Sequence, residues 1–93
     1  MATNELVSKA TDLLLKREPI GLILEKDKDS DIRRKITVFP TKNTAEYIWY
    51  IERWDFEVND IVADYKALVN SDTFSLVDSL FKLFPIVSVK ALF

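Results

Sequence analysis

Apolar residues follow two different spacings along this 93-residue chain. They recur every three or four residues in 4–17 and again in 59–84, whereas they alternate with other residues over much of 20–54. The first spacing puts apolar side chains on one stripe of a helix, and alternation puts them on one face of a strand. The sequence therefore predicts an α+β fold. A single domain spanning 1–93 is expected, because a second domain would leave each half below the roughly 40–50 residues that a core usually needs.

The predicted order of elements is α-β-β-β-α-α. A first helix runs from Asn4 to Arg17, where apolar residues form one stripe. Strands at 20–25, 32–39 and 45–54 follow it, the last of them rich in aromatic and β-branched residues. We expect these strands to form a three-stranded antiparallel meander packed against the helices.

The last third of the chain is predicted to contain two more helices and a short strand. Asn59 can cap a helix over 59–70. Apolar residues cover most of the circumference of another helix over 72–84, which we therefore expect to be buried on more than one side. Pro85 ends that helix. The tail 86–93 alternates as a strand does, and it is expected to add to a sheet edge of its own domain or of a partner.

The strand at 45–54 has apolar residues on both of its faces. Tyr47, Trp49 and Ile51 are predicted to face the core, with Ile48 and Tyr50 on the opposite side. A shift of the strand pairing by one residue would exchange the two sets. The second face is either covered by helices or left as a binding surface, and the sequence leaves both alternatives open.

Residue types that carry common enzyme chemistry are missing from the chain. It has no His and no Cys, which excludes zinc fingers, Ser–His–Asp triads and Cys–His nucleophiles. Its one Gly, at position 21, excludes glycine-rich phosphate loops. The acidic segment 27–31 begins like a calcium loop, but Ile32 stands where that loop needs Gly and Val38 where it needs Glu. We predict no enzyme activity, no metal and no cofactor.

Charge and the expected cellular location limit the partners. Thirteen basic and fifteen acidic residues give a net charge of −2, so no basic surplus attracts a phosphate backbone. The absence of Cys fits a reducing compartment, and no apolar run reaches the length of a membrane span, so we expect a cytoplasmic protein without membrane contact. Nucleic-acid binding by an α-β-β-β-α domain stays as an alternative, because this element order resembles that of double-stranded-RNA-binding domains.

The function that these exclusions favour is non-catalytic protein binding. We expect a small adaptor or inhibitor, of the kind carried by mobile elements or viruses, that acts through an acidic or aromatic face. Acidic residues gather around the expected start of the helix at 59–70, and two aromatic residues of the preceding strand accompany them. Favourable pairing of these acids with the helix dipole is the competing interpretation. The predicted partner-binding residues are Tyr50, Trp54, Asp55, Glu57, Asp60 and Asp64.

Self-association as a structural homodimer is a second alternative. The helix at 72–84 and the tail at 86–93 carry more apolar side chains than one small core needs, and such a surplus can be buried between two copies. The residues predicted to form that dimer surface are Phe81, Phe84, Val87, Val89 and Phe93.

Overall fold

The protein is described here from a computed structural model, which describes residues 4–25, 34–42, 45–55 and 57–92. Within these ranges the chain is α+β, as predicted, but four strands rather than three precede the second helix. The elements in chain order are α1 (Asn4–Leu15), β1 (Ile20–Leu24), β2 (Arg34–Pro40), β3 (Glu46–Asp55), β4 (Asp60–Asn70), α2 (Thr73–Leu83) and β5 (Ile86–Ala91).

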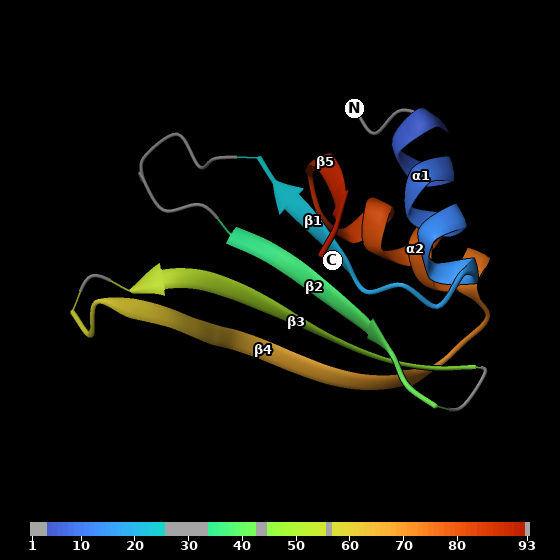
Figure 1. Cartoon of the computed structure of the whole chain (residues 1–93). Coiled ribbons are helices and arrows are strands. Elements are labelled where there is room, and N and C mark those ends of the chain that lie inside the picture. The colour runs from blue at the N-terminus through green and yellow to red at the C-terminus, as the bar shows by residue number, and fades with distance from the viewer. Residues whose placement is uncertain (1–3, 26–33, 43–44, 56, 93) are drawn as a thin grey trace.

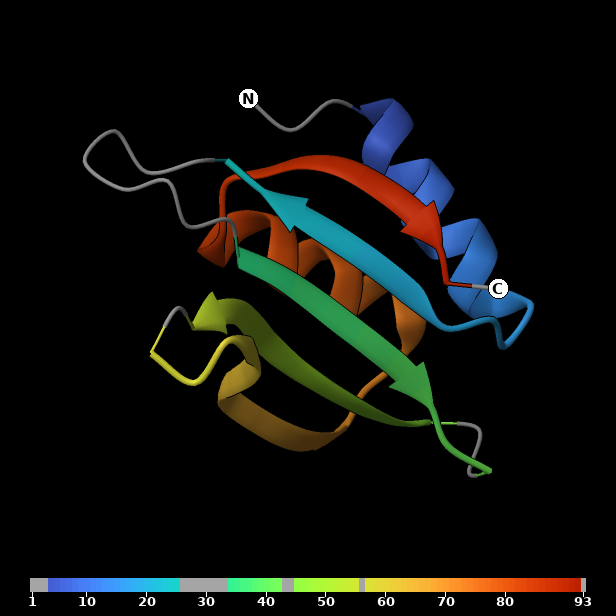
Figure 2. The same cartoon turned by 60° about the vertical axis from the view of Figure 1, so that its left-hand side comes forward.

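The strands form one sheet in the order β4-β3-β2-β1-β5, and every neighbouring pair is antiparallel. Both helices pack on the same side of this sheet (Figure 1), which we call the helix face. On β2, Ile36 and Val38 belong to the helix face, while Thr37 and Phe39 belong to the other side, which we call the outer face. Figure 2 shows both helices behind the sheet, and no described helix covers the outer face.

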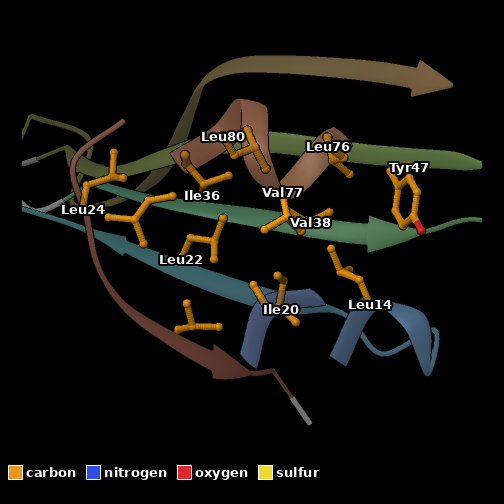
Figure 3. Close-up of a cluster of buried hydrophobic side chains, with 13 residues drawn as sticks. Leu14, Ile20, Leu22, Leu24, Ile36, Val38, Tyr47, Leu76, Val77 and Leu80 are labelled. Carbon is orange, nitrogen blue, oxygen red and sulfur yellow. The ribbon is translucent and has the colours of Figure 1, made fainter. Parts of the chain in front are cut away.

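The hydrophobic core lies between the two helices and the part of the sheet formed by β5, β1, β2 and the start of β3 (Figure 3). β4 contributes no buried residue to it. The core therefore occupies only the part of the helix face that the helices cover. Its buried members are Ala10, Leu14, Ile20, Leu22, Leu24, Ile36, Val38, Tyr47, Leu76, Val77, Leu80, Ile86 and Val89.

The predicted first helix is confirmed as α1, which ends two residues earlier than expected. Ala10 and Leu14 are fully buried, as the apolar stripe requires. Arg17 has a φ of 62°, and its backbone N–H donates to the carbonyl of Leu14 at 2.9 Å. A left-handed residue at this position turns the chain away from the helix axis. The turn directs the chain into β1.

The predicted last helix is confirmed as α2. The Asp72 carboxylate caps it by accepting from the backbone N–H of Ser75 at 2.9 Å and from the Ser75 hydroxyl at 2.8 Å. These two hydrogen bonds lower the pKa of Asp72. Burial on more than one side is a wrong prediction, because Phe74 and Leu83 are both exposed.

The predicted helix at 59–70 is wrong, because this segment is the strand β4. It pairs with β3 along its whole length, from Asp60 opposite Asp55 to Asn70 opposite Glu46. Asn59 has a φ of 54° and lies in the turn that joins the two strands, so it shapes a hairpin rather than capping a helix. The apolar residues of this segment have a helical spacing, but pairing with β3 determines its structure.

The tail is confirmed as a strand on an edge of its own sheet, where β5 pairs with β1. Its predicted alternation is only partly right. Val89 is buried, but Val87 is exposed and Ile86 is buried in its place. A register shift between Ile23 and Leu24 leaves Val87 without an opposite residue on β1. Such an irregularity re-aims the side chains that precede it.

Candidate protein-binding edge

β4 is the terminal strand at one edge of the sheet, and it is exposed on both of its faces. None of its eleven residues is buried. Ile61, Tyr65 and Leu68 are 55%, 54% and 62% exposed, although all three are large and apolar or aromatic. The edge of β4 that points away from β3 has no partner strand among the described residues. A long edge strand of this kind is a template for pairing with another chain.

The exposure of β4 follows from where the helices lie. α1 packs against α2, β5 and β1, at the far side of the sheet. In Figure 1 the long hairpin of β3 and β4 sweeps away from both helices. β4 is held in the sheet by its pairing with β3, for example of Trp49 with Ala67 and of Ile51 with Tyr65. The helices cover little of its helix face.

An aromatic cluster provides the main side-chain link between β4 and the helix layer. The ring of Trp49 lies 5.2 Å from that of Tyr65 and 6.0 Å from that of Phe84, which follows α2. Both distances are within the usual range for interacting aromatic rings. Tyr65 therefore belongs to the helix face, yet more than half of its surface remains exposed. A separate hydrogen bond joins β3 to the helix layer, between the hydroxyl of the buried Tyr47 and the Thr73 hydroxyl at the start of α2.

β4 contains a bulge at Asp64. Tyr65 lies opposite Ile51 and Ala63 opposite Glu52, so Asp64 has no opposite residue on β3. The Asp64 carboxylate instead accepts from Nε of Arg53 at 2.8 Å. Arg53 is two residues from Ile51 and therefore shares its helix face. Two consecutive residues of β4, Asp64 and Tyr65, thus lie on the same face.

The bulge changes which residues of β4 face which side. Before it, Val62 lies opposite Arg53 on the helix face. After it, Lys66 lies opposite Tyr50 and Leu68 opposite Ile48, both on the outer face. The helix face of β4 carries Val62, Asp64, Tyr65, Ala67 and Val69, and its outer face carries Ile61, Ala63, Lys66 and Leu68.

The outer face beside β4 combines an aromatic pair with a polar one. The rings of Phe39 and Tyr50 stack at 5.8 Å, and the Thr37 hydroxyl donates to Oε1 of Glu52 at 2.9 Å. Burial, followed by the negative charge of Glu52, raises the pKa of Tyr50.

The predicted partner-binding residues do not form one face. Glu57 and Asp60 are exposed at the hairpin turn, where the Asp60 carboxylate accepts from the backbone N–H of Ile61 at 2.7 Å. Asp64 is paired with Arg53 on the helix face, and Tyr50 lies on the outer face. The side chains of Trp54 and Asp55 lie outside the described part of the structure. Since no helix begins here, pairing with a helix dipole does not explain these acids.

The residues predicted to form a dimer surface also differ from one another. Val89 is 3% exposed and belongs to the monomer core. Phe81 and Phe84 are half-buried and pack against that core, whereas Val87 is exposed. Phe93 lies outside the described residues. Association through this region stays a prediction.

Two other kinds of site, a metal site and a membrane span, were sought in the described part of the chain. Residues 4–25, 34–42, 45–55 and 57–92 contain no group of three or more carboxylates or other ligands placed to hold a metal ion. No helix described there is long and apolar enough to cross a membrane. No family model, curated protein or solved structure matches this chain. Function is therefore inferred from the geometry of β4.

The apolar residues of this edge were not among the predicted site residues. Their helical spacing led to the prediction of an amphipathic helix whose apolar stripe would be buried. A signal for the strand was nevertheless present, because Val58, Asn59 and Asp60 separate two runs rich in β-branched and aromatic residues. Asn and Asp between two such runs are typical of a hairpin turn.

Proposed function

We propose that this protein is a non-catalytic protein-binding module that takes up an extended segment of a partner protein along the free edge of β4. The observation that carries the proposal is an eleven-residue edge strand with no buried residue and three large exposed side chains. Added strands gain affinity from main-chain hydrogen bonds and specificity from side chains. β4 offers both a free row of main-chain hydrogen-bonding groups and exposed side chains.

The composition of the edge supports a protein ligand over a charged one. Asp60, Asp64 and Lys66 are the charged residues of β4, and Asp64 is already paired with Arg53. Ile61 and Leu68 add an aliphatic surface to the outer face, and Tyr65 adds an aromatic one to the helix face. An extended segment with apolar side chains on both faces would cover all three. This is the chemistry of an adaptor or inhibitor. A cytoplasmic location is part of the proposal, and the absence of Cys fits it.

Selection from a displayed library of random decapeptides tests this proposal. We expect enrichment of peptides with alternating apolar residues, which bind wild-type protein but bind Leu68→Lys at least about tenfold more weakly. Lys on an edge disfavours strand addition, and Leu68 is the most exposed of the three large side chains of β4 at 62%.

Leu83→Lys is the matched control, because it makes the same substitution at a side chain that is 70% exposed on α2. Enriched peptides should bind this variant like wild type. Peptides that bind Leu68→Lys as tightly as wild type but lose affinity for Leu83→Lys would reject β4 as the site. At a dilution where the chain is monomeric, thermal unfolding of the two variants should match that of wild type, since both positions are exposed.

A further inference from the structure

We propose that the strand received by β4 is the β4 strand of a second copy of this chain, so that two five-stranded sheets join into one continuous sheet about a two-fold axis. This inference rests on the proposed function and names its partner. It derives from the bulge at Asp64, because the bulge decides which strands can match the whole edge.

A two-fold axis perpendicular to a sheet pairs identical strands antiparallel, and residues directly opposite each other then share a face. A regular foreign strand alternates strictly between faces. It stays in step with β4 on only one side of the Asp64–Tyr65 pair, because these two residues share a face. A second copy that runs in the opposite direction carries the same bulge. It can therefore stay in step along the full strand.

Only one register matches faces throughout 60–69. In this register Asp64 lies opposite Tyr65 of the second copy, and the two bulges meet at the axis. A shift by one residue in either direction sets a helix-face residue against an outer-face residue at some point along the edge. The remaining opposed pairs, each formed twice, are Ile61 with Leu68, Val62 with Ala67, Ala63 with Lys66, and Asp60 with Val69.

This register is also compatible with the exposed side chains and charges of β4. Ile61 and Leu68 cover each other on the outer face, and these contacts occur once on each side of the axis. The Tyr65 rings meet near the axis on the helix face. No two like charges lie directly opposite each other. The two Asp64 carboxylates approach the axis, but each is paired with Arg53 of its own copy.

A pair of complementary variants tests both the dimer and its register by light scattering. Wild type should be a dimer that dissociates on dilution. Ile61→Lys and Leu68→Asp should each raise the dimer dissociation constant on the order of a hundredfold, because each places a charge opposite an apolar side chain twice. An equimolar mixture of the two variants should form a heterodimer. In that heterodimer the introduced ammonium faces the introduced carboxylate, and the unchanged Leu68 faces the unchanged Ile61.

Leu83→Lys should remain a dimer and controls for a general effect of charge. A wild-type protein that stays monomeric at every concentration would overturn the inference, while the peptide selection would still decide whether β4 binds a foreign strand. A dimer that neither Ile61→Lys nor Leu68→Asp weakens would place the interface elsewhere and would also overturn it. Two monomeric variants whose mixture does not associate would overturn the register. Misfolded chains could not form this heterodimer, so dimer formation in the mixture would also show that both variants fold.

Discussion

The two edges of the sheet differ in how they are covered. β5 is six residues long, and Ile86 and Val89 place it in the core. Hydrogen bonds extend its pairing with β1 beyond both ends, from Glu25 N–H to Pro85 and from Leu92 N–H to Pro19. β4 is nearly twice as long but contributes no buried residue to the core, and only the half-buried Val69 packs against it. The position of the helices, rather than strand length, decides which edge is structural and which is available to a partner.

This difference has a consequence for local stability. Opening β5 would expose buried apolar surface. Opening β4 would expose less, namely its pairing with β3, the Trp49–Tyr65 contact and the half-buried Val69 that packs against the core. The cooperative core therefore consists of both helices with β5, β1, β2 and the start of β3, which carries the buried Tyr47. The hairpin of β3 and β4 extends from it as a ribbon whose last strand is held mainly by backbone hydrogen bonds.

The largest expected difference between the edges comes from a charge placed on each at the same residue type. Val89→Asp buries an unpaired carboxylate in the core and should reduce the free energy of unfolding by about 3 kcal/mol or more. Val62→Asp, at a half-buried position of the otherwise exposed β4, should cost less than about 1 kcal/mol. Urea unfolding at a dilution where the chain is monomeric measures both. Equal losses would contradict the assignment of the two edges.

An intermediate effect is expected at the aromatic link between β4 and the helix layer. Trp49→Ala removes the ring that contacts both Tyr65 and Phe84, and it should cost about 2 kcal/mol because Trp49 is only half-buried. Amide hydrogen exchange should accelerate in β4 much more than in β1. Uniform acceleration across both strands would show that β4 belongs to the same cooperative unit as the core.

The smallest effect concerns Tyr50 on the outer face and appears only at alkaline pH. Its raised pKa means that folding favours the neutral phenol, so this contribution is complete below the pKa of the unfolded chain, about 10, and is lost as pH rises through the higher folded value. Thermal midpoints measured from pH 8 to pH 11 should therefore fall more for wild type than for Tyr50→Phe. Parallel curves would show that Tyr50 is not shielded by its neighbours.

Most of the core elements were predictable from the sequence because local pattern and long-range packing agree there. The stripe that contains Ala10 and Leu14 forms α1, and the faces of β3 were assigned correctly, with Tyr47 buried. At β4 the two levels disagree. Ile61, Tyr65 and Leu68 lie close to one stripe of a helix, but β3 offers a complete row of backbone partners, and pairing prevails.

The candidate site was less predictable than the fold, since it depends on what the helices leave uncovered. Sequence reasoning placed Tyr50 and Asp64 on one binding surface, but the two lie on opposite faces of the sheet. The bulge that sets the proposed register is a property of the pairing, in which Asp64 is the extra residue opposite the step from Ile51 to Glu52 of β3. The sequence gives no signal for this bulge, because an Asp such as Asp64 also occurs at many positions without one.

Amide hydrogen exchange of wild-type protein, recorded residue by residue at low and high protein concentration, tests the assignment of the two edges most directly. We predict that amides of β4 become more protected as concentration rises, because their free edge gains a partner strand, while amides of β5 remain unchanged. Protection that rises with concentration in β5 or α2 and not in β4 would contradict the account. The free edge would then play no part in association.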